Sequence, residues 1–160
     1  MIRVRRITTV DPLYEQECAL RDAVLLRPIG YSMEAFRRDF AIDDRAEHFV
    51  AVFDHPSGPR VVGCALLIPD YPEPGVGKLM QMAVDLQRQG EGIGRRLVVE
   101  LERRAFGELG LREVFCHARD DAMGFYSRLG WRIDGEQFME VGVPHHRMCL
   151  APPDEEDEGE

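Results

Sequence analysis

The 160-residue sequence lacks the features that mark membrane and secreted proteins. It has no run of 18 apolar residues, so no transmembrane helix is predicted. Residues 1–6 include three arginines, but no apolar stretch of signal-peptide type follows them. We therefore expect a cytoplasmic protein that has no membrane partner.

Cysteine is sparse and scattered. The four cysteines, Cys18, Cys64, Cys116 and Cys149, form no C-x-x-C pair and do not have the spacing of a zinc site. They are predicted to be small buried hydrophobic residues, and no metal is expected.

An excess of positive charge is also missing. The formal net charge is −9, and the six acidic residues of segment 154–160 account for −6 of this net charge. Nucleic-acid binding favours a basic surface, so a nucleic-acid partner is not expected. An acidic run cannot bury apolar surface, so residues 153–160 are predicted to be a disordered tail that follows a single domain spanning residues 1–152.

Three well-known motifs are absent. A dinucleotide fingerprint G-x-G-x-x-G that began at Gly90 would need Gly or Ala at position 95, where the sequence has Arg95. No G-K-[ST] completes a P-loop, and no G-x-S-x-G segment supports a serine hydrolase.

The segment from residue 79 to residue 106 predicts a strand, a glycine-rich loop and a helix. Residues 79–84 are an apolar run of strand length, and Gly90, Gly92 and Gly94 precede a helical pattern in which apolar residues recur every four positions, at Ile93, Leu97, Leu101 and Ala105. A helix amino terminus attracts anions, and glycines let a phosphate approach the backbone. The alternative is a turn that only joins the strand to the helix.

The rest of the chain predicts a mixture of strands and helices without internal repeats. Strands are expected over residues 2–7, 48–53, 60–68, 113–118, 131–139 and 145–150, and helices over residues 12–26, 32–40 and 121–129. The strands before and after the long central helix should be parallel neighbours in one sheet.

Two sequence motifs suggest a family. Gln89, Gly92 and Gly94 match Q-x-x-G-x-G, and residues 122–131 are similar to A-x-x-F-Y-x-x-L-G-F. Together they resemble the GNAT superfamily of acyl-CoA-dependent N-acyltransferases. The resemblance implies a single-domain α/β (α+β) GNAT-like fold, with a mixed central sheet of about seven strands and about four flanking helices. One departure is Arg119, which stands where the family often has Asn.

The resemblance also implies a donor and the residues that bind it. Acetyl-CoA would be the co-substrate, and the central strand would splay from its neighbour so that its backbone holds the pantetheine arm. The implied cofactor-binding residues are Met82, Ala83, Val84, Gln89, Gly90, Glu91, Gly92, Ile93, Gly94, Arg95 and Arg119. Tyr126 matches the general acid that assists the departing thiolate. Without the motif around it, Tyr126 would be interpreted as a core residue on the apolar face of its helix.

The acceptor and the general base stay open at this stage. The acceptor is expected to be an amine-bearing small molecule or protein, and the resemblance makes Tyr31, Met33, Glu34, Phe36 and Arg37 candidates for contacting it. Gln81 lies where a base would be convenient, but an amide is no base. The candidates that remain for this role are His117, Glu34, Asp85, His145 and Glu140.

The sequence therefore predicts an N-acetyltransferase, either a monomer or a homodimer, that transfers an acetyl group to an amine by direct attack on the thioester. An alternative hypothesis is a sensor that binds acyl-CoA without turnover. A third is a protein acceptor steered to the enzyme by the acidic tail.

Overall fold

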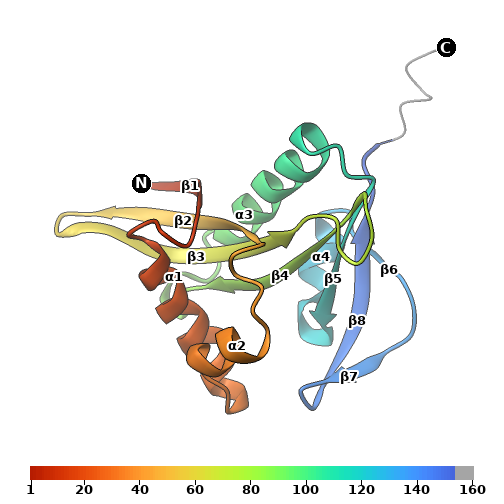
Figure 1. Cartoon of the computed structure of the whole chain (residues 1–160), viewed down its shortest axis with the longest axis horizontal. Helices are drawn as coiled ribbons and strands as arrows, with labels where there is room; N and C mark the ends of the chain where they lie inside the picture. The colour runs from red at the N-terminus through yellow and green to blue at the C-terminus, as the bar shows by residue number, and fades with distance from the viewer. Residues whose placement is uncertain (154–160) are drawn as a thin grey trace.

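The computed structural model describes residues 1–153, and these form one mixed sheet with helices on both faces (Figure 1). The strands occur in the order β1-β2-β3-β4-β5-β8-β6, and β7 pairs separately with β8. Their bounds are β1 Ile2–Ile7, β2 Glu47–His55, β3 Gly58–Ile68, β4 Val76–Val84, β5 Glu113–Arg119, β6 Arg132–Ile133, β7 Phe138–Glu140 and β8 Val143–Leu150. The predicted α+β fold with one mixed central sheet is confirmed.

The helices form where the apolar spacing predicted them. Their bounds are α1 Tyr14–Arg21, α2 Met33–Asp39, α3 Ile93–Glu102 and α4 Met123–Arg128. The turns of α1 continue as a π-helix over Asp22–Leu26 and a 3-10 helix over Arg27–Ile29, until Gly30 adopts a left-handed conformation at φ +76°. The Ser32 hydroxyl accepts a hydrogen bond from the Ala35 amide and so caps α2.

Each face of the sheet has its own hydrophobic core. On one face α3 and α4 cover the sheet, and the predicted apolar stripe of Ile93, Leu97, Leu101 and Ala105 is fully buried there. On the other face α1 and α2 pack against β2, β3 and β4 through residues such as Met33. The sheet thus carries an independent layer of helices on each side, and its middle strands are buried on both.

The middle of the sheet contains the feature that creates a site. Strands β4 and β5 are parallel, as predicted, but they pair only at Val76↔Glu113, Gly77↔Val114 and Lys78↔Phe115. Beyond that point the two strands diverge (Figure 1). The carboxyl-terminal parts of β4 and β5 therefore face each other across a gap.

A β-bulge bends β4 beside this gap. The register between β3 and β4 shifts after Cys64↔Ala83, and Gln81 adopts a left-handed backbone conformation at φ +51°. This conformation is unusual for a residue with a side chain, and it redirects β4 where the strand leaves β5.

Two predictions about local structure need comment. The single strand predicted over residues 131–139 is wrong, since this segment contains two short strands, β6 and β7, with non-strand residues between them. Only Pro153 of the predicted disordered tail, residues 153–160, lies among the described residues. Within the described range, no helix has the length and apolar character needed to cross a bilayer.

Candidate active site

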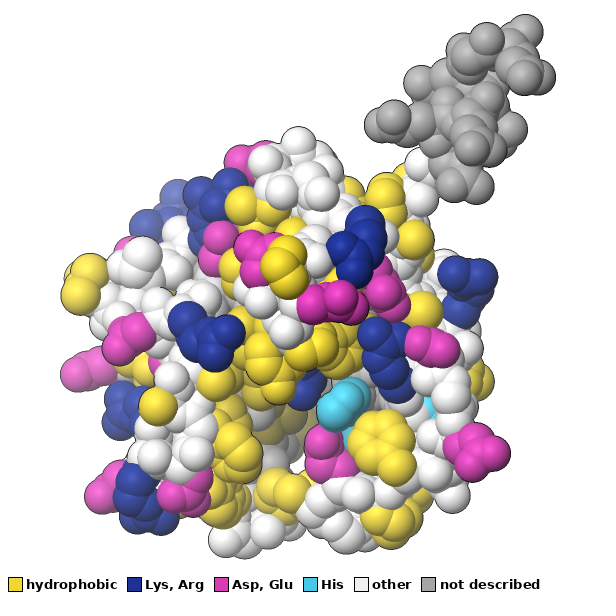
Figure 2. Space-filling view, turned by 45° about the vertical axis from the view of Figure 1, so that its right-hand side comes forward, with side chains coloured by type: hydrophobic (Ala, Val, Ile, Leu, Met, Phe, Trp, Pro, Cys, Tyr) yellow, Lys and Arg dark blue, Asp and Glu magenta, His cyan; other side chains and the backbone are white. Residues whose placement is uncertain are grey.

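A cavity of about 620 Å³ occupies the region where β4 and β5 diverge. One part of its wall is apolar and comes from the segment between α1 and β2 together with β3. The lining residues of this part include Val24, Leu25, Leu26, Ile29, Tyr31, Phe36, Phe40, Ile42, Ile68 and Tyr71. Figure 2 shows the hollow with hydrophobic side chains around it and histidine, acidic and basic side chains at its border.

The other part of the cavity wall carries the polar groups. It is formed by β4, β5, β7, β8 and the start of α4, and it includes Lys78, Gln81, Met82, His117, Arg119, Tyr126, Glu140 and His145. The structure thus brings Met82, Arg119 and Tyr126 of the predicted site to one cavity. Ala83 instead points into the core below α1, and the predicted loop residues lie beyond the end of β4.

The glycine loop connects the end of β4 to α3. Gly90 and Gly92 have φ of +83° and +79°, and a Cβ built on either would meet no atom within 4 Å. Gly92 is the N-cap of α3 and provides no side-chain cap, and the first turn has no acidic residue. The amino-terminal amides of α3 thus lack the usual protein partner and are open to an anion.

Gly94 lies within the first turn of α3 and has a different role. A Cβ at this position would lie 3.1 Å from Cε of Met82 and 3.3 Å from Cζ of Phe125. The absence of a side chain therefore allows α3, β4 and α4 to approach one another closely.

Three charged or polar side chains near the loop already have partners. The Gln89 amide donates a hydrogen bond to the main-chain oxygen of Val84 at 3.0 Å, which ties the loop to the end of β4. Glu91 pairs with Arg88 at 3.5 Å, and Arg119 pairs with Asp121 at 3.2 Å. Arg95 and Arg96 are exposed in the first turn of α3.

Tyr126 reaches the cavity from α4. Its side chain is buried, packs against Phe125 and Trp131, and donates a hydrogen bond from its hydroxyl to Sδ of Met82 at 3.7 Å. A thioether is a weak acceptor, so the hydroxyl can donate more strongly to a better one. Burial, with a smaller contribution from Cys116, raises the pKa of Tyr126 well above its usual value, so the phenol stays protonated.

Three titratable side chains meet at the opposite border of the cavity. Nδ1 of His117 lies 3.0 Å from Oε1 of Glu140, and Nε2 of His145 lies 3.6 Å from Oε2 of the same carboxylate. Nδ1 of His145 lies 2.8 Å from the main-chain oxygen of Val143, to which it donates. His146 points to the other face of the sheet and contacts Asp120, as the predicted strand alternation requires.

Lys78 adds a positive charge to the same wall. Its ammonium lies 5.9 Å from the ring centroids of both Tyr71 and Phe115. Burial lowers the pKa of Lys78, although Glu140 opposes this effect. The polar border of the cavity therefore combines one carboxylate with several cationic or basic groups.

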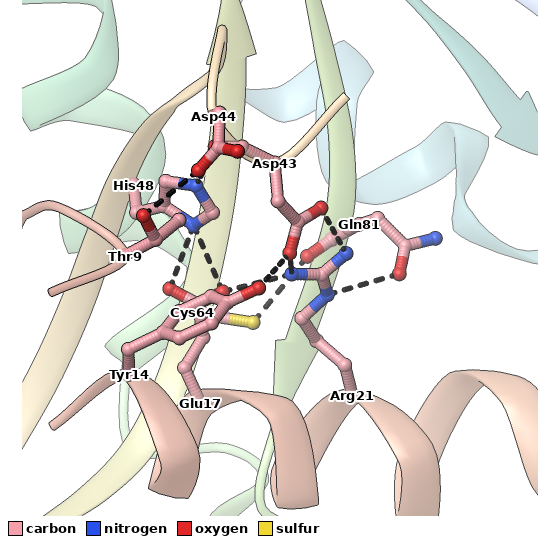
Figure 3. Close-up of polar contacts among 9 residues, drawn as sticks. All are labelled: Thr9, Tyr14, Glu17, Arg21, Asp43, Asp44, His48, Cys64 and Gln81. Atoms are coloured by element: carbon pink, nitrogen blue, oxygen red, sulfur yellow. Dashed lines mark hydrogen bonds and ion pairs between the residues drawn. The ribbon is translucent and has the colours of Figure 1, made fainter. Parts of the chain in front are cut away.

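A buried polar network holds the bulged strand, and the sequence analysis did not anticipate it (Figure 3). Arg21 of α1 donates two hydrogen bonds to Asp43, at 2.9 and 3.1 Å, and one to Glu17 at 2.9 Å. Its Nε donates a further one to the side-chain oxygen of Gln81 at 3.1 Å. The Cys64 thiol also donates to the main-chain oxygen of Gln81. Hydrogen bonds thus hold both the side-chain oxygen and the main-chain oxygen of Gln81, the residue at the bulge.

His48 completes this network as a cation. Its Nδ1 lies 3.0 and 2.9 Å from the two carboxylate oxygens of Glu17, and its Nε2 lies 2.7 Å from the main-chain oxygen of Asp43. These oxygens only accept, so both ring nitrogens donate. Burial alone would lower the pKa of His48, but the hydrogen bonds and negative charges of Glu17 and Asp43 together outweigh burial and raise it. Two carboxylates then balance two cations.

Within residues 1–153, two groups of side chains have the proximity that a metal site requires, but the carboxylates of each pair with an arginine. Glu17, Asp43 and His48 enclose Arg21, as described above. In the second group, Glu113, Asp134 and Cys149, both carboxylates contact Arg147. In each group a guanidinium thus already balances the carboxylates that a metal ion would need as ligands.

The candidates for acceptor contact and for the general base fall into two groups, those that line the cavity and those that do not. Tyr31 and Phe36 line the cavity, whereas Met33 is in the core and Glu34 and Arg37 are exposed outside the lining. Among the proposed bases, Asp85 and Glu34 lie away from the cavity, and the carboxylate of Asp85 accepts from the Gln87 amide. His117, His145 and Glu140 are the candidates that line it.

Comparison with known proteins agrees with this architecture. The model of the acetyltransferase (GNAT) family matches residues 14–131. The uncharacterized protein YyaT of Bacillus subtilis is 26% identical over 147 residues, which cover 92% of this chain and 94% of YyaT.

Solved structures agree as well. An acyl-CoA N-acyltransferase from Pseudomonas aeruginosa superimposes with a TM-score of 0.76 at 19% identity, covering 94% of this chain and all of that one. An aminoglycoside 6'-N-acetyltransferase complexed with coenzyme A gives a TM-score of 0.75 at 18% identity, with 95% and 99% of the two chains covered.

Proposed function

Because this chain belongs to the GNAT acetyltransferase family, we propose that it transfers the acetyl group of acetyl-CoA to the amine of an acceptor by direct attack on the thioester. The observation that carries this proposal is the gap between β4 and β5, with Tyr126 at its side and the glycine loop at its end.

The proposed donor site extends along the gap. The diphosphate of the donor binds the open amides of the α3 amino terminus, near Gly92 and Arg95. The pantetheine arm lies beside residues 82–84, where β4 has no β5 neighbour to occupy its edge. The structural relative with bound coenzyme A supports a donor of this kind. Arg119, at the cavity border, adds a positive charge for a phosphate.

The proposed chemistry follows from these positions. The neutral amine attacks the thioester carbon, a C–N bond forms, and negative charge collects on the carbonyl oxygen. The C–S bond then breaks, and the departing thiolate takes a hydrogen bond or a proton from the Tyr126 hydroxyl, which solvent restores. Because the pKa of this phenol is raised, hydrogen bonding is the larger contribution. The amine nitrogen loses one proton in the same reaction.

Two measurements on the wild-type protein test the proposal. Isothermal titration with coenzyme A should give one binding event per chain. Release of free thiol from acetyl-CoA should depend on an added amine when hexylamine, phenethylamine, spermidine and kanamycin are supplied in turn. No binding of coenzyme A would overturn the donor assignment.

The same experiment distinguishes the alternative function. Tight binding of coenzyme A together with thiol release that no amine stimulates would indicate a sensor of acyl-CoA. The presence of Tyr126 and of basic groups in one cavity favours an enzyme, because a sensor would not need a proton donor beside the thioester.

A further inference from the structure

We propose that His117 is the general base of the transfer and that Glu140 is its positioning residue. This proposal rests on the proposed function. Oε1 of Glu140 accepts from Nδ1 of His117 at 3.0 Å, and in that tautomer the imidazole carries its proton on Nδ1 and its lone pair on Nε2. Among the described residues, Nε2 of His117 has no hydrogen-bond partner, and His117 lines the cavity.

The position of His117 in the sheet supports this role. Lys78↔Phe115 is the last pair of β4 and β5, and His117 lies two residues further along β5, on the same face of the strand as Phe115. Tyr126 reaches the cavity from the face covered by α4, whereas His117 stands on the opposite face with Glu140 and His145. An amine between the two strands can thus meet a base on one side while the thiolate meets Tyr126 on the other.

The separation of His117 and Glu140 in the sequence explains why this pair was not predicted. His117 and Glu140 are 23 residues apart and belong to β5 and β7, which both pair with β8 but not with each other. The ring of Phe138 contacts the rings of both His117 and His145 and packs them together. Glu140 thus has a fixed place relative to both histidines.

The proton balance is complete within the cavity. When the C–N bond forms, the attacking nitrogen gives one proton to Nε2 of His117, which becomes an imidazolium paired with Glu140. The proton then passes to solvent through the open side of the cavity. No oxidant, reductant or further reactant is needed.

Substitution of His117 tests the role through the pH dependence of kcat. The charged and titratable groups that face this histidine are Glu140, His145, Arg147 and Lys78. His117→Gln should lower kcat by about 10²- to 10⁴-fold, the usual contribution of a general base, and leave the Kd of coenzyme A unchanged. For the wild type, kcat should rise with pH and become constant above the pKa of a single titrating group. For His117→Gln, kcat should keep rising with pH as the fraction of neutral amine increases.

Two further variants sharpen the test. His55→Gln changes an exposed histidine at the end of β2 and should keep the wild-type profile. Glu140→Gln removes the negative charge that pairs with His117 and replaces one carboxylate oxygen by an NH2 donor, so the tautomer is no longer fixed. It should lower kcat by about 10- to 100-fold, move the levelling point, and leave KM for acetyl-CoA unchanged.

The contrary results are separate for the two claims. If wild type and His117→Gln release thiol at the same amine-dependent rate, His117 is not the base. If the pH profile of kcat for Glu140→Gln matches that of wild type, Glu140 does not position His117. If wild type itself shows no amine-dependent release, the proposed function fails instead.

A second inference concerns the acceptor, and the composition of the cavity wall carries it independently. We infer that the acceptor has one amine on an apolar body and is not a polyamine or an aminoglycoside. Among the described residues that line the cavity, Glu140 is the single acidic one, and Lys78 and Arg119 are cationic. A molecule with several ammonium groups would meet too few carboxylates and, at Lys78, a like charge that is not already assigned to the donor.

The apolar wall provides the complementary half of the argument. Ile29, Phe40 and Tyr31 belong to the part of the cavity wall that the segment between α1 and β2 forms, and Ile29 and Phe40 remain exposed in the described structure. An alkyl or aryl group placed there would bury these side chains, whereas a second ammonium would lose its water without gaining a partner. This arrangement also differs from what the name of the aminoglycoside-modifying relative would suggest.

A matched pair of acceptors tests the second inference. Hexylamine and 1,6-diaminohexane have the same length and differ by one ammonium at the far end. For the wild type, kcat/KM should be at least about 10-fold higher for hexylamine, since a charge that loses its water against an apolar wall costs well over 1 kcal/mol. Ile29→Asp adds a carboxylate to the apolar wall and should reduce or reverse this ratio.

Equal or higher kcat/KM with the diamine for wild type would overturn the inference, and so would efficient acetylation of kanamycin. These outcomes still require acetyl transfer, so they leave the proposed function intact.

Discussion

Nε of Arg21 in α1 donates a hydrogen bond to the side-chain oxygen of Gln81 at 3.1 Å and so links the first helix to the bulge of the central strand. The rest of the guanidinium is held by Glu17 and Asp43 inside the protein. A residue with an unusual backbone conformation beside the cavity is therefore fixed by a fully buried charge cluster, which makes α1 part of the scaffold of the candidate active site.

Arg21→Met should destabilise the protein strongly. It leaves Glu17 and Asp43 without the cation between them, and loss of one partner of a buried ion pair typically costs about 3–5 kcal/mol. The free energy of unfolding from urea titration provides the measurement. Arg3→Met removes an ion pair with Asp54 at 3.5 Å whose side chains are both half exposed, and it should cost less than about 1 kcal/mol. Similar losses for the two variants would contradict the structural role given to Arg21.

His48 should make stability depend on pH. Its pKa in the folded protein is raised above the value of about 6.5 for an unfolded chain, so its contribution is full below that value and is lost as pH rises through the folded pKa. Between these two pKa values the free energy of unfolding should fall by up to about 1.4 kcal/mol per pH unit.

Replacing the histidine should remove that slope. His48→Gln is expected to be less stable than wild type at pH 6 and to show a flatter pH dependence above it, whereas the exposed His55→Gln should follow the wild-type curve. An unchanged slope in His48→Gln would mean that His48 is not the protonated group inferred from its contacts.

Gly92→Ala should weaken the binding of coenzyme A. An alanine at φ +79° is strained by about 1–2 kcal/mol and would alter the amino terminus of α3, where the diphosphate is proposed to bind. Gly110→Ala is the matched control, because Gly110 has φ +65°, equally open space, and a position just after Arg103–Glu108, the π-helix that continues α3. Both variants should lose similar stability, but only Gly92→Ala should raise the Kd of coenzyme A, by about 10-fold or more, since about 1.4 kcal/mol corresponds to a factor of ten. Equal Kd values would place the diphosphate elsewhere.

Tyr126→Phe should slow acetyl transfer while leaving donor binding nearly unchanged. A hydrogen bond to a charged group is worth about 1.5–3 kcal/mol, so kcat should fall by about 10- to 150-fold. The hydroxyl donates to a thioether in the described structure, so the melting temperature should change little. An unaltered kcat would remove Tyr126 from the mechanism.

Local sequence patterns predicted the parts of this fold that depend on near neighbours. The buried stripe of α3 follows from apolar residues four positions apart, and the α2 cap follows from Ser32. The strand–loop–helix unit around Gly92 likewise depends on residues close in sequence. The parallel arrangement of β4 and β5 follows from the helical crossover that connects them, which is the usual connection between parallel neighbours.

Features that need distant partners could not be predicted in the same way. The bulge at Gln81 depends on Arg21, which is 60 residues away, and the burial of His48 depends on Glu17, 31 residues earlier. One signal was present, since Tyr14, Glu17, Cys18 and Arg21 recur at helical spacing, which places charged residues on the apolar face of α1. Because one strand was predicted over residues 131–139, the separate strand β7 was not predicted, and neither was the position of Glu140 in it.

The short stretch over which β4 pairs with β5 also affects product release. An extended arm with amide groups can lie along the free edge of β4 as an added strand would, and that attachment does not involve the acetyl group. Free coenzyme A would then bind almost as tightly as acetyl-CoA. Turnover with a fast acceptor should accordingly be governed by escape of free coenzyme A, which would appear as strong product inhibition and as a rate that falls when the solvent is made more viscous.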